Sequence, residues 1–430
     1  MALRFPSITF SNRWSMVIEN PMLKIKRKTK LPSAVAARAS RKKGFRQFVF
    51  AAVTVAISLC LVEVGGALIE KLSPGVAPPA GILVSDPVFH HRWQPNMQYQ
   101  DGFRSVPYLL RTNGQRWVED HDVPQQKPPG VYRIFFLGDS NTQGVVAPEH
   151  KMVKLVEKKL NEALGGRRLR VETINTGTSS FSIFQYYLLV RYVLPDFSPD
   201  LVVIDVDMTD VPNDFFYRRF AKYDERGDPI AVDSGNSPNR SKKGYRLTPF
   251  GTVELSPMEN LRLRLHEWSA AFRILERALA VLRPPAPATA VRTHDNSGEE
   301  THADWLATSW TPEIRANVEF SMNLLGKAID LLRARRVRVI VTGVPHYPQF
   351  TGSWSVEPHT ALRQATLAHG GIFFDTYEAL RPIMANSLLT DYYWSNDDTH
   401  FNIAGNAAWA DALAQFILSQ RENLFRDLRN

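Results

Sequence analysis

A short apolar run that ends in a polar loop is the feature that most constrains the fold of this chain. Residues Val131–Leu137 read VYRIFFL and follow a Pro-Pro-Gly turn, so we expect a buried β-strand there. The loop Gly138–Gly144 reads GDSNTQG, and a helix is expected from near Pro148. In α/β sheets the reactive groups gather at the carboxyl ends of the strands, and Ser140 stands at such an end. The stretch therefore predicts an α/β sheet with a candidate nucleophile at its edge.

Strand-like and helix-like segments alternate along the rest of the chain. The later predicted strands cover 169–174, 201–207, 337–342 and 372–374, and the predicted helices cover 148–164, 182–194, 312–335, 361–369 and 403–419. This alternation implies a parallel sheet with helices on both faces. It breaks over residues 211–311, an insert that serves either as a lid or substrate-recognition element over the active face or as a surface addition.

A serine hydroxyl is a poor nucleophile until a base takes its proton, and a candidate base lies near the other end of the chain. The segment Ser395–His400 reads SNDDTH. Asp397 and His400 are three residues apart, so one turn of backbone lets the carboxylate hold the imidazole. His400 is then the predicted base, Asp397 fixes its tautomer, and Ser140 attacks.

The two blocks GDSNTQG and DDTH, in this order at opposite ends of one domain, resemble the defining blocks of the SGNH/GDSL hydrolases. The resemblance implies a flavodoxin-like three-layer α/β/α sandwich with a parallel sheet over residues 131–420. It also implies a serine esterase whose catalytic residues are Ser140, His400 and Asp397.

The same resemblance implies an oxyanion hole built from the backbone N–H groups of Ser140 and Gly177 and from an asparagine after the third strand. Gly177 follows the second predicted strand; the plainer alternative is a turn glycine. Thr209 stands where the asparagine is expected. Either the Thr209 hydroxyl substitutes, or Asn213 swings in, or the activity is weak or specialised.

His346 follows the predicted strand 337–342 and so reaches the same edge of the sheet. It either contacts substrate or, in the interpretation we favour, is a solvated loop histidine.

The first 69 residues predict a membrane anchor. Residues 1–47 form a basic tail, and residues 48–69 are apolar except for Glu63. Twenty-two helical residues span about 33 Å, enough to cross a hydrocarbon core of about 30 Å. Basic residues on the N-terminal side predict a cytoplasmic N-terminus, and we favour an uncleaved anchor over a cleaved signal peptide. Glu63 is expected near the outer interface or beside a partner.

Composition limits the partners and cofactors. Residues 1–47 hold twelve lysines and arginines, whereas the whole chain has a net charge of only +9, so the main domain has no basic excess for nucleic acid. Cys60 is the single cysteine and lies in the apolar stretch, which excludes cysteine-based zinc sites in the rest of the chain. We expect no metal and no cofactor.

Residues 70–130 are expected to form a connector that packs as an extended flap on the main domain, as in membrane-anchored bacterial members of the family. The predicted protein is thus a single-pass protein of the bacterial inner membrane with an extracytoplasmic esterase domain. We expect it to cleave an O-acyl ester, most simply O-acetyl, of an envelope or secreted glycan; a lipid or small soluble ester is the alternative substrate. There are two alternative functions: an O-acyltransferase that uses the same triad, and a non-catalytic glycan-binding or assembly protein.

Overall fold

The computed structural model describes residues 34–72, 83–103, 106–164, 169–233, 269–281, 304–395 and 397–425, with Met258, Leu261 and Leu265 as isolated positions. Most of the predicted tail, and the part of the predicted insert between residues 234 and 303 apart from these positions and 269–281, lie outside the described residues. The chain forms two compact units, Met1–Leu61 and Val62–Asn430.

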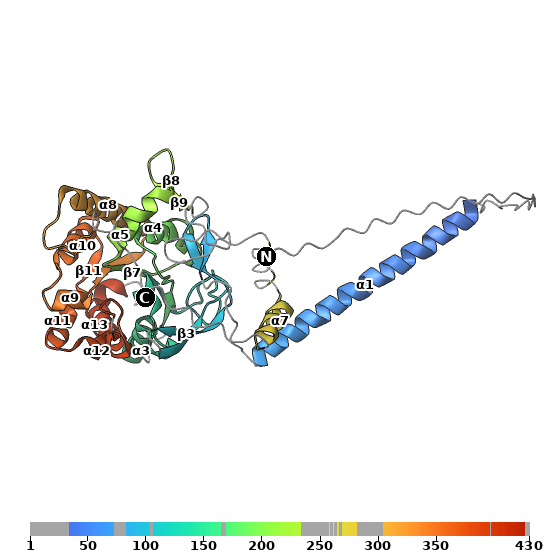
Figure 1. Ribbon diagram of the computed structural model, residues 1–430, viewed down its shortest axis with the longest axis horizontal. Helices are drawn as coiled ribbons and strands as arrows, with labels where there is room; N and C mark the ends of the chain where they lie inside the picture. Colours follow the sequence, from blue (N-terminus) through green and yellow to red (C-terminus); the bar gives the residue numbers. More distant parts are fainter. Residues whose placement is uncertain are drawn as a thin grey trace, which may run out of the picture. The chain divides into compact units, whose positions relative to one another are not determined.

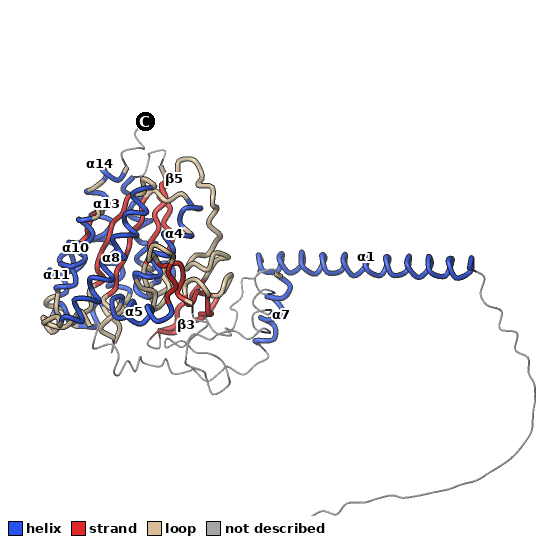
Figure 2. Tube along the Cα trace, turned by 90° about the horizontal axis from the view of Figure 1, so that it is seen from above, coloured by secondary structure: helices blue, strands red, loops and turns tan. Residues whose placement is uncertain are grey.

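A five-stranded sheet forms the centre of the second unit. In spatial order its strands are β11 (Ile372–Phe374), β10 (Arg338–Val344), β7 (Leu201–Asp207), β5 (Val131–Leu137) and β6 (Arg170–Asn175). All four pairings between neighbours are parallel. Helices lie on both sides of the strands (Figures 1 and 2). The predicted three-layer α/β/α sandwich is therefore confirmed.

The central strand β5 shows why the sheet lies between two layers. All seven of its side chains are buried. Tyr132, Ile134 and Phe136 join one hydrophobic core, and Phe135 and Leu137 join the other. Because successive side chains of a strand point to opposite faces, a continuous apolar run must be covered on both sides.

Each face is covered by its own helices. One core contains side chains of α4 (Ile183–Tyr192) and α8 (Pro312–Ala334), and the other contains side chains of α3 (Met152–Leu164) and α13 (Ile403–Ser419). The remaining helical segments near the sheet are α2 (Ser140–Gln143), η1 (Pro148–His150), η2 (Leu194–Phe197), α5 (Asp210–Tyr217), η3 (Arg218–Phe220), α9 (Tyr347–Phe350), α10 (Glu357–Ala368), α11 (Thr376–Met384), α12 (Leu389–Tyr392) and α14 (Arg421–Leu424).

The predicted boundaries are wrong where a terminal signal was overlooked. The helix predicted over 361–369 begins earlier, at Glu357, because Pro358 fits the first turn of a helix, where no N–H is needed. The single helix predicted over 148–164 is interrupted by Lys151, whose backbone is extended. The start of the insert, where no strand was predicted, contains an antiparallel pair, β8 (Ala221–Tyr223) and β9 (Pro229–Val232).

The connector packs on the sheet domain at the end of β6. It contains two antiparallel pairs: β1 (Leu83–Asp86) with β2 (His90–Trp93), and β3 (Gln98–Phe103) with β4 (Val106–Arg111). The indole N–H of Trp93 donates to the Gly177 carbonyl at 3.1 Å, and His91 Nε2 lies 2.8 Å from the Ser179 carbonyl oxygen. The loop that follows β6 is thus held from outside by the connector.

Helix α1 (Ala34–Leu72) includes the apolar segment Phe45–Ile69, which has a mean hydropathy of 2.3. Among the described residues it is the one helix long and apolar enough to cross a membrane. Glu63 has a partner within the second unit: its Oε2 accepts a hydrogen bond from Ser269 Oγ at 2.7 Å, and its Oε1 accepts one from the first N–H of α7 (Ala270–Val281). A carboxylate at a helix N-terminus satisfies otherwise unpaired N–H groups.

Trp93 provides a test of how firmly the connector is bound. Its side chain is buried and its hydrogen bond reaches a loop of the sheet domain. Trp93→Phe is expected to lower the free energy of unfolding by about 1–3 kcal/mol, since the Gly177 carbonyl loses this donor. Trp93→Ala is expected to cost about 3–5 kcal/mol because it also opens a cavity. Urea unfolding of the full chain, followed by circular dichroism, measures both.

The exposed Tyr192→Phe is the control and should stay within about 0.5 kcal/mol of wild type. A Trp93→Ala variant as stable as this control contradicts a packed connector.

Candidate active site

Ser140 stands at the carboxyl edge of the sheet because β5 ends at Leu137 and the chain turns at once into the short helix α2. The Asp139 side chain caps this helix: its Oδ1 accepts a hydrogen bond from the Asn141 N–H at 2.8 Å. The capped turn leaves Ser140 half-buried, whereas Asn141 and Thr142 are buried. The nucleophile candidate is thus the accessible residue of a fixed turn.

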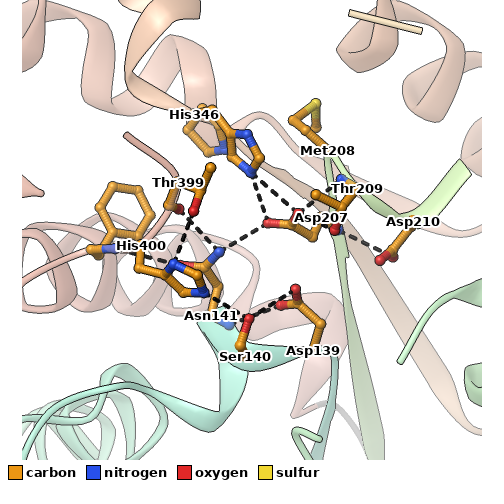
Figure 3. A network of polar contacts seen from close by, with 12 residues as sticks. Asp139, Ser140, Asn141, Asp207, Met208, Thr209, Asp210, His346, Thr399 and His400 are labelled. Carbon is orange, nitrogen blue, oxygen red and sulfur yellow. Dashed lines mark hydrogen bonds and ion pairs between the residues drawn. The ribbon is translucent and has the colours of Figure 1, made fainter. Parts of the chain in front are cut away.

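His400 meets Ser140 from the other end of the chain (Figure 3), and Asp397 lies beside His400. Ser140 Oγ lies 2.8 Å from His400 Nε2, and His400 Nδ1 lies 2.9 Å from Asp397 Oδ2. Both distances are those of a nucleophile–base pair and a base–orienter pair. The structure therefore brings together the three residues that the sequence predicted as catalytic.

A tight turn before α13 holds the base and its carboxylate. Asp397 Oδ1 accepts hydrogen bonds from the Thr399 N–H at 3.0 Å and from the Thr399 hydroxyl at 2.8 Å. Asn402 then caps α13, its side chain accepting from the Gly405 N–H. Because α13 packs in the core, this cap fixes the loop at the edge of the sheet.

The electrostatics favour an ionised Asp397. Burial alone raises the pKa of this carboxyl group, but hydrogen bonds and charge from His400 and hydrogen bonds from Thr399 outweigh burial and hold the pKa well below its usual range. An ionised carboxylate at Nδ1 keeps the proton of the neutral imidazole on that nitrogen, so Nε2 is the atom that accepts a proton from Ser140.

Gly177 lies beside the nucleophile turn. A methyl group at this position would lie 2.2 Å from the Gln143 nitrogen, so only glycine permits this approach of the two backbones. Its N–H donates to Asn175 Oδ1 at 2.9 Å. The N–H therefore already has an acceptor, and its role as an oxyanion donor remains a prediction.

Thr209 is exposed at the end of β7, and both of its donors are engaged by one carboxylate. Its N–H and its hydroxyl each lie 2.8 Å from Asp207 Oδ1. To serve an oxyanion, the hydroxyl must leave Asp207. The alternative donor Asn213 is buried one turn into α5.

His346 is not the solvated loop histidine that the sequence favoured; that expectation is wrong. Its side chain is 1 % exposed, and its Nε2 lies 3.2 Å from both carboxylate oxygens of Asp207. Asn141 and Asp207 were missed as site residues. Part of a signal was available, because Asp207 ends one predicted strand and His346 follows another, so both were expected at one edge of the sheet. That these two strands, β7 and β10, are neighbours is shown only by the structure.

Four carboxyl groups are buried around the nucleophile turn. Burial, followed by repulsion from Asp207, raises the pKa of Asp139 well above its usual value. Burial, with Asp139 and Asp207 nearby, does the same for the pKa of Asp210. Burial also raises the pKa of Asp205 to about 7. Asp207 is the exception: burial opposes ionisation, but His346 and the Thr209 hydrogen bonds lower its pKa.

One group among the described residues has the donor atoms for a metal ion: Glu119, Asp120 and His121. Lys154 Nζ already pairs with Glu119 Oε2 at 2.7 Å. A cation at this position would therefore compete with an ammonium group for the one buried carboxylate.

Comparison with protein families decides the assignment. The sequence pattern of the GDSL-like lipase/acylhydrolase family matches residues 136–408, from inside β5 to inside α13. The chain belongs to this SGNH/GDSL hydrolase family. It is a carboxylic ester hydrolase, and its nucleophile block and its base block both lie within the matched segment. A comparison with curated proteins returned no significant match.

Solved structures similar to this hydrolase include an acetylxylan esterase from Geobacillus stearothermophilus, with 12 % identity, a TM-score of 0.36, and coverage of 66 % of this chain and 94 % of that one. A two-domain esterase active on acetylated mannans has 13 % identity and a TM-score of 0.35, covering 67 % of this chain and 49 % of that one. An α/β hydrolase from the metagenome of Lake Arreo, Spain, has 16 % identity and a TM-score of 0.34, covering 67 % of this chain and 94 % of that one. Likeness at this level says nothing of the substrate.

The buried Asp205 predicts a pH dependence of stability. An unfolded aspartate has a pKa of about 3.9, whereas burial raises the folded-state pKa to about 7, against a smaller opposing effect of the Thr142 hydrogen bond. Between these values the folded state keeps a proton that the unfolded state has released. The free energy of unfolding should therefore fall as pH rises through this window, by up to about 4 kcal/mol from this group.

The variant Asp205→Asn should lose this contribution. Urea unfolding of both proteins between about pH 4.5 and 8 measures it as the difference between two curves. Burial raises the pKa of Asp214 to about 6, so this residue adds its own pH dependence of the free energy of unfolding, which is present in the wild type and in Asp205→Asn alike. Parallel curves contradict a protonated Asp205.

Proposed function

We propose that the protein is a serine esterase that cleaves an O-acetyl ester of a glycan outside the cytoplasm. The 2.8 Å approach of Ser140 Oγ to His400 Nε2 carries the proposal, supported by the 2.9 Å contact of His400 with Asp397.

In the first half of the reaction, Ser140 Oγ attacks the acyl carbon and forms a C–O bond while His400 Nε2 takes the hydroxyl proton. The tetrahedral intermediate then expels the alcohol, which receives that proton from His400. In the second half, water attacks the acyl-enzyme with His400 again as base, and the acid and free Ser140 are released. Asp397 orients the imidazole throughout.

The oxyanion is held by the N–H groups of Ser140 and Gly177 and by Thr209. Gly177 and Thr209 have acceptors in the free enzyme, at Asn175 and Asp207. Both bonds must be exchanged for the oxyanion in the transition state. Such an exchange yields less net stabilisation than an unengaged donor, so we expect modest rates on simple esters.

The location supports the choice of substrate. An apolar helix at Phe45–Ile69 that follows a basic tail anchors the protein in the inner membrane of a bacterium with a cytoplasmic N-terminus. The esterase domain then faces the compartment where envelope and secreted glycans lie.

The first test uses the full chain in mild detergent with p-nitrophenyl acetate and with an acetylated oligosaccharide. Ser140→Ala is expected to lose at least about 10³-fold in kcat, because the nucleophile is gone. The exposed Ser395→Ala, in the loop that carries His400, is the control and should keep the wild-type rate.

The outcomes separate the candidate functions. Acetate released in water and lost in Ser140→Ala supports the hydrolase. Acetyl transfer that occurs only with an added acceptor sugar indicates a transferase, and glycan binding with equal rates in wild type and Ser140→Ala indicates a binding protein.

The proposed topology is tested by protease added to spheroplasts of a Gram-negative host that expresses the chain with a C-terminal epitope. We expect the epitope to be digested without lysis, because the domain lies outside the cytoplasmic membrane. An epitope that is protected until the cells are lysed contradicts this topology; a cytoplasmic marker protein controls for leakage.

A further inference from the structure

One buried carboxylate joins three segments of the active site. Asp207, 1 % exposed, accepts hydrogen bonds from the N–H and hydroxyl of Thr209, both at 2.8 Å, and from Asn141 Nδ2 at 2.9 Å. His346 Nε2 lies 3.2 Å from each of its oxygens (Figure 3). The proposed triad uses neither Asp207 nor His346.

His346 is held so that its ring faces Asp207. Its backbone N–H donates to Gln349 Oε1 at 2.9 Å at the start of α9, and its ring packs against Trp354 with 5.9 Å between centroids. Burial opposes ionisation of Asp207, and the interaction with His346 is the largest of the effects that nevertheless lower its pKa. Burial, with a smaller effect of His346, lowers the pKa of the nearby His359 to about 4, although Asp375 opposes the shift.

Asn141 transmits this arrangement to the triad. It is the residue after the nucleophile, and its Nδ2 donates both to Asp207 Oδ2 and to the Thr399 carbonyl at 3.1 Å. Thr399 in turn donates to Asp397 and lies beside His400. A single side-chain amide therefore connects the turn that carries the nucleophile to the loop that carries the base.

We propose that Asp207 and His346 form a second imidazole–carboxylate pair that positions Asn141 and thereby sets the distance between Ser140 and His400. They are positioning residues and take no proton from the substrate. The inference deepens the proposed function and rests on it. An ionised Asp207 accepts a charge-assisted hydrogen bond from Asn141 Nδ2 and so holds the amide with its NH2 group toward both acceptors more strongly than a neutral carboxyl group would.

The test compares Asp207→Asn, His346→Leu and His346→Gln in the full chain. Asp207→Asn keeps the size of the side chain but replaces an acceptor oxygen by a donor that faces Asn141 and His346. His346→Leu removes the ring N–H, whereas His346→Gln supplies an amide donor. The matched control is Asp214→Asn. Asp214 is also buried, and its carboxylate accepts hydrogen bonds from the Ser182 hydroxyl and the Phe184 N–H.

The readouts are kcat and KM for p-nitrophenyl acetate, with kcat expressed per serine labelled to completion by a fluorophosphonate. We expect kcat to fall about 10–100-fold in Asp207→Asn and His346→Leu, because loss of alignment acts on the chemical step. KM should change less than threefold, the initial labelling rate should fall in parallel with kcat, and His346→Gln should recover at least part of the loss. Asp214→Asn should lower stability and leave kcat per labelled serine unchanged.

Two results overturn the inference. One is kcat per labelled serine within threefold of wild type in both Asp207→Asn and His346→Leu. The other is a loss in His346→Gln as large as in His346→Leu, which indicates that packing of the ring matters and hydrogen bonding does not. If Asp207→Asn does not fold, the two His346 variants decide. If Ser140→Ala keeps full activity, the proposed function fails first, and that result is distinct from both.

Discussion

The hydrogen bond between Ser140 and His400 is the interaction on which this site depends, and it joins residues 260 positions apart at 2.8 Å. Ser140 is a poor nucleophile by itself at neutral pH, since a free serine hydroxyl holds its proton tightly. The cap of α2 by Asp139 fixes the turn that carries Ser140, and the cap of α13 by Asn402 fixes the loop that carries His400. Both caps therefore help to hold the two side chains at this distance.

The parallel sheet makes such a contact possible. In a parallel sheet every strand delivers its carboxyl end to one edge, so loops that are remote in sequence converge there. The same geometry brings acidic residues together where they are buried from solvent, and this lowers stability unless the carboxyl groups are protonated or paired. The structure uses both solutions: Asp139 and Asp210 have raised pKa values, while Asp207 is paired with His346.

The sequence predicted those parts of the fold that local patterns determine. The strands 131–137, 201–207 and 372–374 and the helix 403–419 occur at the predicted bounds, because apolar runs and caps mark their ends directly. The meeting of Ser140, Asp397 and His400 was also predicted, from the spacing of the last two and from the resemblance of two blocks to a family.

The sequence did not predict which residues of different strands lie beside one another. His346 looked like a loop residue because nothing local shows that β10 lies beside β7, with Val344 opposite Asp207. Gly177 looked like an oxyanion donor or a turn residue, and its close packing on Gln143 emerges only when two loops are placed in space. Register between distant strands is set by the whole core, so it escapes a local argument.

The most direct test of the central claim is to trap the acyl-enzyme. The full chain is mixed with p-nitrophenyl acetate, quenched in acid within the first turnovers, and analysed by peptide mass spectrometry. We predict one acetyl group on the peptide that contains Ser140, and a much slower appearance of that group in His400→Ala. An acetyl group on a different residue, or an undiminished rate of Ser140 acetylation in His400→Ala, contradicts the account.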